Sequence, residues 1–148
     1  MGKNALTGDP TINTLNRKLL ISSKYSEMGL IVPTRRLFGL GQRNGKFKLD
    51  SGSYTMLARG RKEYLPAEDY LGGKQGNHIH PFILGQTGDK SFFGIFFANT
   101  GVQHFEIIHF TKFNNTVINY IHLGPNIEIY FIFGKTAPEV VAHYHKMI

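Results

Sequence analysis

Two histidines give the sequence its clearest candidate for metal chemistry. His78 and His80 are separated by one residue, so their imidazoles lie on the same face of an extended segment. Imidazole nitrogens are common ligands of zinc and copper. A metal centre would need a third ligand, for which His104 and His109 are candidates. A strand that begins at His80 accounts for the same residues without a metal, and we expect no metal site and no cofactor.

The sequence lacks the residues of several other chemistries. It contains no cysteine, which excludes disulfides, thiolate zinc sites and cysteine nucleophiles. Two glycine-rich stretches, Gly39-Leu40-Gly41 and Gly72-Gly73-Lys74, lack the Gly-Lys-Ser/Thr sequence that opens the helix of a phosphate loop. Asn114-Asn115-Thr116 is a glycosylation sequon, which has meaning only in a secreted chain.

The charge of the chain is basic but dispersed. Seventeen Lys and Arg against 10 Asp and Glu give a net charge of +7, which would permit contact with nucleic acid or anionic membranes. The basic residues stand in pairs and singly, without a long run of like charge, so we expect no nucleic-acid partner. No apolar stretch reaches the roughly 18 residues of a membrane span. Residues 1–10 lack the apolar core of a secretory signal.

Most of the chain is predicted to form short β-strands. Hydrophobic residues make up 41% of the sequence and there are 17 glycines, which suits a globular fold with many tight turns. Apolar runs alternate with turn residues such as Asn44-Gly45, and the pattern predicts an antiparallel β-sandwich. Residues 92–97 are apolar on both faces, as in a central strand covered on each side. The predicted strands cover residues 19–21, 30–32, 37–41, 47–49, 54–58, 80–84, 91–98, 105–110, 117–123 and 127–133.

A C-terminal helix is predicted at residues 137–148. Thr136 and Glu139 have the spacing of a capping box. Apolar residues then follow at helical spacing on one face: Val140, Val141, Tyr144, Met147 and Ile148. Since no later residue covers the edge formed by the last three, we expect it to contact a partner or a further domain.

Residues 59–77 are predicted to form a long irregular loop. They show no periodicity and contain several glycines and a proline. A loop of this length inside a compact domain is more often functional than idle. Tyr64 and Tyr70 within it could offer rings for stacking against a carbohydrate.

Five motifs occur in a recognisable order along the chain: Val32-Pro33-Thr34 with Leu37 to Gln42, Tyr54 to Arg59, His80 to Leu84, Gly94 to Asn99, and Ile129 to Gly134 with Pro138 to Val141. In this order and spacing they resemble the N-terminal β-sandwich of the α-glucosidase-like glycoside hydrolases of family 31. The resemblance covers residues 17–148. It implies a galactose-mutarotase-like sandwich with one C-terminal helix.

The resemblance also implies where a sugar would be contacted. In the family, the strand that matches residues 54–58 ends in an Arg-Asp pair, and the loop after it reaches over the mouth of a catalytic barrel, where the Asp helps to hold the sugar. The matching residues here are Arg59 and Gly60, and Gly60 carries no carboxylate. An acidic residue of the same loop could compensate, namely Glu63, Glu68 or Asp69. The candidate substrate-binding residues are therefore Arg59, Gly60 and Asp69.

The family's catalytic carboxylates lie in the barrel that follows the sandwich. Retaining glycoside hydrolysis needs two carboxyl groups roughly 5 Å apart. The 10 acidic residues here stand mostly in predicted loops and offer no such pair, so we nominate no catalytic residue and expect no hydrolysis by the chain alone.

We expect residues 1–16 to be poorly structured and residues 17–148 to form the sandwich, incomplete on its N-terminal side. The implied function is that of an accessory domain that packs on the barrel of an enzyme hydrolysing α-linked glucosides. A non-catalytic structural subunit or remnant of such an enzyme is the alternative, favoured by the basic charge and by Gly60. A lectin-like module that binds α-glucan is a third. Family members are often secretory, lysosomal or endoplasmic-reticulum proteins, and the compartment of this chain stays open.

Overall fold

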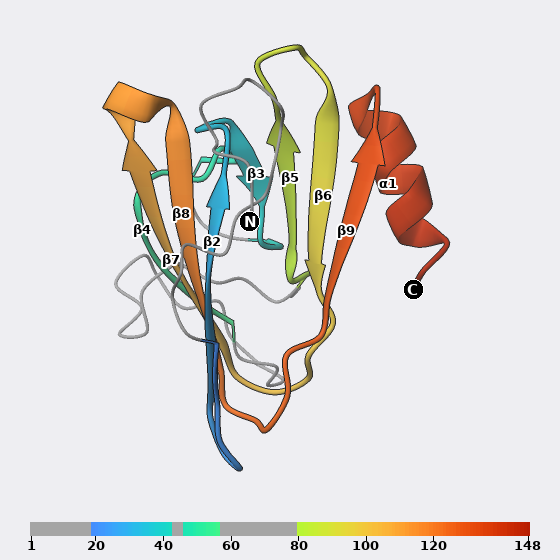
Figure 1. The fold of residues 1–148 in the computed structure, drawn as a ribbon. Coiled ribbons are helices and arrows are strands. Elements are labelled where there is room, and N and C mark those ends of the chain that lie inside the picture. The colour runs from blue at the N-terminus through green and yellow to red at the C-terminus, as the bar shows by residue number, and fades with distance from the viewer. Residues whose placement is uncertain (1–18, 43–45, 57–79) are drawn as a thin grey trace, which may run out of the picture.

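The computed structural model describes residues 19–42, 46–56 and 80–148. These residues form two antiparallel β-sheets that face one another, with a helix beside one of them (Figure 1). One sheet has the strand order β1-β2-β8-β7-β4 and the other the order β3-β5-β6-β9. The predicted fold class, a mainly β antiparallel sandwich with a C-terminal helix, is confirmed.

The five-stranded sheet is built around two long strands. Its members are β1 (Leu20–Ile21), β2 (Ser26–Val32), β4 (Gly52–Met56), β7 (Gln103–Phe110) and β8 (Asn115–His122). A short 3-10 helix, η1 (Thr111–Phe113), joins β7 to β8. In the register of the sheet Ile118 lies opposite both Leu30 and Ile107, and all three side chains are buried. Apolar residues on one face of these strands therefore form half of the core.

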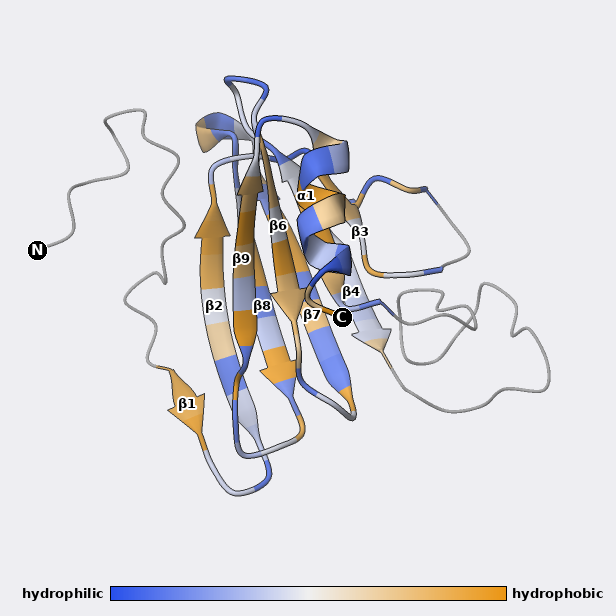
Figure 2. Cartoon of the chain, turned by 90° about the vertical axis from the view of Figure 1, so that its right-hand side faces the viewer, coloured by the Kyte–Doolittle hydropathy of each residue, from blue (hydrophilic) through white to orange (hydrophobic). Residues whose placement is uncertain are grey.

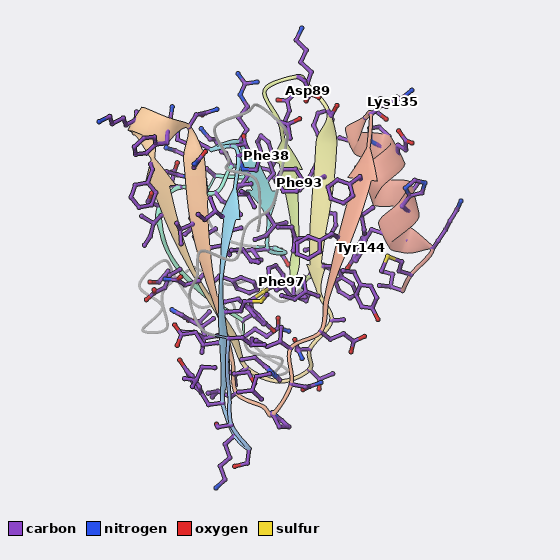
Figure 3. The ribbon with its side chains drawn as sticks, in the orientation of Figure 1. Phe38, Asp89, Phe93, Phe97, Lys135 and Tyr144 are labelled. Carbon is purple, nitrogen blue, oxygen red and sulfur yellow. The ribbon has the colours of Figure 1, made fainter. Side chains whose placement is uncertain are left out.

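The four-stranded sheet consists of β3 (Leu37–Gly39), β5 (Phe82–Gln86), β6 (Phe92–Phe97) and β9 (Ile129–Gly134). The strand β6 lies between β5 and β9, so the prediction of a central strand at residues 92–97 is confirmed. Alternate side chains of β6 enter the interior, where Phe97 contacts two rings of the other sheet. The ring centroid of Phe97 (labelled in Figure 3) lies 4.8 Å from that of Phe105 and 4.6 Å from that of Tyr120.

The helix α1 (Ala137–His145) covers the outer face of the four-stranded sheet (Figure 2). Val140 and Tyr144 are buried there. The Tyr144 ring stacks on Phe82, with 4.4 Å between centroids, and meets Phe96 edge-on at 5.1 Å. The expectation that Tyr144 lies on an uncovered edge is therefore wrong, because the chain's own sheet covers it. Met147 and Ile148 remain exposed.

The start of α1 is held by the predicted capping box. The Thr136 hydroxyl oxygen accepts a hydrogen bond from the Glu139 N–H at 3.3 Å. The Glu139 carboxylate accepts one from the N–H of Lys135 at 2.9 Å, one residue earlier than in the usual form of the motif. The helix ends at His145 rather than at Ile148, because the N–H of Lys146 already bonds to the carbonyl of His143 in a tighter turn.

Most predicted strands begin or end one or two residues from the observed bounds, and two differences are larger. The strand β2 begins at Ser26, within a stretch predicted to be polar connection, because the buried Ser26 hydroxyl donates to the carbonyl of Gly124 at 2.7 Å. The strand predicted at residues 47–49 is reduced to an isolated bridge between Phe38 and Lys48. Phe47 is largely exposed and its ring packs on Phe38. Residues 1–16, 57 and 58 lie outside the described part of the chain.

Gly94 and Gly134 make room for α1, and substitution of Gly94 tests how closely the helix packs on the sheet. A Cβ at Gly94 would lie 2.6 Å from the Phe82 ring and 2.9 Å from Val140. We expect Gly94→Ala to destabilise the fold by about 1–3 kcal/mol, because the crowded atoms belong to the packed sheet and helix. Chemical unfolding measures the change. Gly88→Ala, where a Cβ meets nothing within 4 Å, is the control and should be near neutral. Equal stability of the Gly94→Ala variant and the wild type would contradict this packing.

Candidate functional site

The sequence-predicted sugar-binding residues lie outside the described part of the chain. Arg59, Gly60 and Asp69, together with the alternatives Glu63 and Glu68, fall within residues 57–79. The same holds for the tyrosines proposed to stack on sugar, Tyr64 and Tyr70. These assignments stay predictions.

The histidines proposed as third metal ligands have other partners. The Nδ1 of His104 lies 2.8 Å from the Thr55 hydroxyl oxygen, across the β4–β7 pair. The ring of His109 lies between the Thr116 hydroxyl oxygen, at 2.7 Å, and the carbonyl of Leu49, at 2.8 Å. In residues 19–42, 46–56 and 80–148 no group of three or more His, Cys, Asp or Glu side chains is placed to hold a metal ion. His78 lies outside these ranges.

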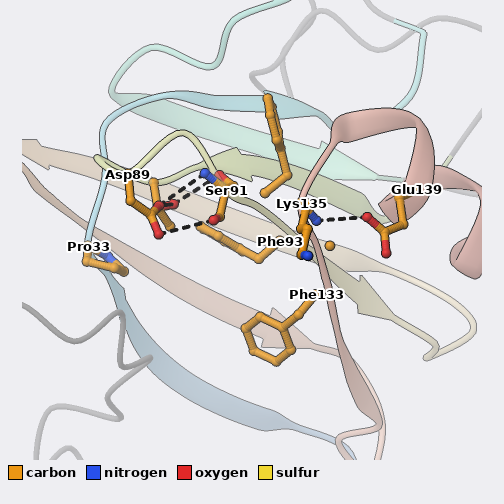
Figure 4. Close-up of a pocket in the computed structure, with 10 residues that line it drawn as sticks. Pro33, Asp89, Ser91, Phe93, Phe133, Lys135 and Glu139 are labelled. Atoms are coloured by element: carbon orange, nitrogen blue, oxygen red, sulfur yellow. Dashed lines mark hydrogen bonds between the residues drawn. The ribbon is translucent and has the colours of Figure 1, made fainter.

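A cavity of about 330 Å³, here called the apolar pocket, opens at one end of the sandwich (Figure 4). Phenylalanine rings of β6 and β9 form much of its wall, and the turn before α1 and the β5–β6 turn supply its polar groups. This combination of ring faces and a few polar groups is typical of small-ligand sites. The lining residues are Pro33, Thr87, Asp89, Ser91, Phe92, Phe93, Phe133, Gly134, Lys135 and Glu139.

Both carboxylates of the apolar pocket hold local backbone turns. Asp89 accepts hydrogen bonds from the Thr87 hydroxyl, from the Ser91 N–H at 3.0 Å and from the Ser91 hydroxyl at 3.1 Å (Figure 4). These donors, the Thr87 hydroxyl first, hold the pKa of the Asp89 carboxyl below its usual value. Glu139 is engaged in the cap of α1. Each carboxylate therefore has a structural task at the pocket.

The other end of the sandwich contains a buried polar network that the sequence pattern did not predict. The Tyr120 hydroxyl lies 3.0 Å from the Asn99 side-chain oxygen and 3.1 Å from that of Gln103, and burial raises the pKa of Tyr120. Asn99 also donates to the carbonyl of Asn126 and accepts from the N–H of Glu128. The network ties the connection after β6 to the connection before β9. Its role is to close this end of the core.

The fold is shared with parts of larger solved proteins. It aligns with the cycloalternan-degrading enzyme from Trueperella pyogenes at a TM-score of 0.63 and 10% identity, covering 87% of this chain and 18% of that one. It aligns with a Kfla1895 mutant in complex with isomaltose at a TM-score of 0.60 and 12% identity, covering 81% and 16%. The class defined by the fold is thus a β-sandwich of the type found within these larger proteins.

The curated sequence relatives are α-glucosidases. The chain is 25% identical over 143 residues to a probable alpha/beta-glucosidase, agdC, of Aspergillus fumigatus, covering 95% of this chain and 16% of the relative. It is 26% identical over 144 residues to the lysosomal acid alpha-glucosidase of Tetrahymena pyriformis, covering 96% and 15%. No family model matches the sequence. The predicted resemblance to α-glucosidase-like glycoside hydrolases is confirmed, and the chain spans about 16% of the length of these relatives.

Among the residues that the structure describes, no helix has the length and apolar character needed to cross a bilayer.

Asp89 should give the fold a measurable pH dependence. Because its folded pKa lies below the unfolded value, the stability that it contributes is present above the unfolded pKa, about 4, and is lost as the pH falls through the folded pKa. We expect Asp89→Asn to flatten the acid limb of a plot of unfolding midpoint against pH. Asp50→Asn, which removes another exposed carboxylate, is the control. An unchanged acid limb in Asp89→Asn would show that the turn does not depend on this charge.

Substitution of Tyr120 tests how much the buried network contributes to stability. We expect Tyr120→Phe to destabilise the fold by about 1–3 kcal/mol, because it removes the hydroxyl that bonds the buried side-chain oxygen of Gln103, whereas the Asn99 oxygen keeps the N–H of Glu128. Tyr130→Phe is the matched control, since that hydroxyl donates to Glu128 at the surface and its loss should be near neutral. Urea unfolding of both variants measures the difference. Equal effects of the two substitutions would contradict the role given to the network.

Proposed function

We propose that this chain is an accessory, non-catalytic β-sandwich domain of an α-glucosidase-like glycoside hydrolase. One observation carries the proposal: nearly the whole chain, 95% of it, aligns with only 16% of the probable alpha/beta-glucosidase. A domain-sized part of a larger enzyme has this relation to its relatives. The domain comprises residues 17–148 in this proposal, and hydrolysis of α-linked glucosides belongs to the parent enzyme.

The chemistry of the apolar pocket supports a non-catalytic role. A catalytic carboxylate must be able to exchange a proton with substrate or attack it. Asp89 accepts three hydrogen bonds from its own turn, and Glu139 is engaged in the cap of α1. If either carboxylate gave up these hydrogen bonds to act on a substrate, the turn that it stabilises would loosen.

The surface proposed for the catalytic domain lies at the end of α1. Met147 and Ile148 are 43% and 69% exposed, and Tyr130 on the same outer face of the sheet is 40% exposed. The Tyr130 ring lies 6.1 Å from Phe96, which also contacts Tyr144 of the helix. A neighbouring domain that covers these residues would extend the existing apolar cluster between helix and sheet.

A contact with sugar is the second part of the proposal. Arg59 and the acidic residues of the same loop, Asp69 first, are proposed to reach the sugar bound by the catalytic domain, with Gly60 in the place of the family's Asp. The support is the resemblance of residues 54–59 to the family motif.

The accessory-domain proposal and the structural-subunit alternative differ in what the gene encodes after this chain. Sequencing the transcript beyond the codon for Ile148 separates the two. An open frame that continues into a barrel with catalytic carboxylates supports the accessory domain. A stop codon supports a separate subunit. A lectin-like role predicts binding heat on calorimetric titration with maltose and longer α-glucans. Absence of binding heat at millimolar sugar would exclude this role.

The purified 148-residue chain should show no turnover of p-nitrophenyl α-glucoside or maltose above the buffer blank. The physical reason is that the pocket carboxylates serve as turn and helix caps. A discontinuous assay of released glucose, run beside an intact α-glucosidase, makes the measurement. Turnover that co-purifies with the chain and disappears in an Asp69→Asn or Asp89→Asn variant would overturn the non-catalytic assignment.

A further inference from the structure

A second cavity, here called the basic pocket, lies on the other side of the β5–β6 turn from the apolar pocket. Its volume is about 280 Å³, and Thr87 lines both cavities. Its polar wall includes Thr34, Arg35, Arg36, Lys48, Gln86 and Asn114. Three of these six side chains are cations and none is a carboxylate. The residues come from four separate segments of the chain.

The sheet holds Arg36 and Gln86 face to face. The register of β3 and β5 pairs Leu37 with Gly85, which places Arg36 opposite Gln86. The N–H of Gln86 donates to the carbonyl of Arg36 at 3.0 Å, and the Arg36 guanidinium donates to the Gln86 side-chain oxygen at 3.1 Å. Lys48 is brought to the same place by its bridge to Phe38. The positions of two cations are thus set by backbone pairing.

Arg35 is held from the other sheet. Its Nη1 donates to the Thr111 hydroxyl oxygen at 3.3 Å and its Nε to the Asn114 side-chain oxygen at 3.4 Å. Like Gln86, these partners are neutral. They orient the guanidinium without cancelling its charge, and a guanidinium has five donors, so several stay available.

The charge of the pocket is not neutralised within the described residues. The ion pair found in that part of the chain joins Lys46 to Asp50. Asp89, on the adjoining turn, lines the apolar pocket and accepts from Thr87 and Ser91. Three cations around a concave surface focus a positive potential that attracts an anion.

We propose that the basic pocket binds the phosphate group of a phosphate monoester. A tetrahedral dianion offers several acceptor oxygens, which match two guanidinium forks and one ammonium better than a single carboxylate does. Arg36 and Lys48 are exposed, and the three cations converge on one concavity of about 280 Å³ rather than forming a basic stripe along a nucleic-acid backbone. This site goes beyond the accessory role proposed above and does not depend on it.

The phosphate has two possible sources, a soluble sugar phosphate or the headgroup of an anionic lipid. The lipid source has a structural basis because Arg35 is bonded to Thr111 of η1, at the tip of the β7–β8 hairpin. Phe110 and Phe113 at this tip are 45% and 64% exposed. Rings in this position could enter the interface of a bilayer whose phosphate fills the pocket.

The test is a titration of the isotope-labelled full chain, followed by amide NMR, with sodium phosphate, glucose 6-phosphate and glucose. We expect the two phosphates to shift the amides of Arg36 and Gln86, and glucose to leave them unchanged. The double variant Arg36→Gln/Lys48→Gln should weaken phosphate binding about tenfold or more, through loss of charge-assisted hydrogen bonds. The control Lys24→Gln/Lys146→Gln removes the same net charge elsewhere and should stay within about twofold of the wild type.

The source is decided by comparing glucose 6-phosphate with vesicles of phosphatidylcholine containing phosphatidic acid. Tighter binding of the sugar phosphate than of phosphate, without sedimentation on the vesicles, assigns a soluble ligand. Sedimentation that is lost in the double variant and reduced in Phe113→Ser assigns a lipid. Absence of amide shifts at about 10 mM phosphate, shifts that map away from the pocket, or equal weakening in both double variants would overturn the proposal.

Discussion

The fold depends on the coverage of β6 on both faces. Phe93, Ile95 and Phe97 point from this strand into the sandwich interior, where Phe97 meets rings of the other sheet. On its outer face Gly94 and Phe96 receive α1. Because β6 is covered on both faces, large side chains need small neighbours, which are Gly94 on β6 itself and Gly85 on the adjacent strand β5. A Cβ at Gly85 would fall 2.1 Å from the Phe93 ring, so glycine there is a condition for the core packing.

The two ends of the sandwich differ in how they satisfy polar groups. At one end Asn99, Gln103 and Tyr120 bond to one another and to loop backbone. His122 adds to this closure, with its ring nitrogens 3.0 Å from the carbonyl of Asn126 and 2.6 Å from that of Thr100. At the other end both cavities open around the β5–β6 turn. The two cavities therefore lie away from the closed end.

Local sequence signals predicted what local interactions determine. The apolar residues on both faces of 92–97 identified the central strand, because burial on two sides leaves its mark in the composition of the strand itself. Thr136 with Glu139 identified the start of the helix, because this cap joins residues three apart in sequence. The start of β2 was missed because it depends on Ser26 meeting Gly124, far along the chain. Coverage of Tyr144 was missed for the same reason, since its partners Phe82 and Phe96 come from other strands. The family motif placed the candidate sugar contacts in residues 57–79, which the structure does not describe.

Net charge and its spread along the sequence are weak guides to anion binding. The dispersed lysines and arginines argued against a nucleic-acid surface, yet the pairing of β3 with β5 and the bridge of Phe38 to Lys48 bring Lys48, distant in sequence, to the same cavity as Arg35 and Arg36. Arg35 and Arg36 lie in the connection between β2 and β3 rather than on a strand. Their common pocket requires Arg35 to turn toward Asn114 and Arg36 toward Gln86, two neutral partners from different sheets. The site is thus a product of the sandwich itself, and any uncharged substitution that shifts the register of β3 on β5 should separate these cations without changing the net charge of the chain.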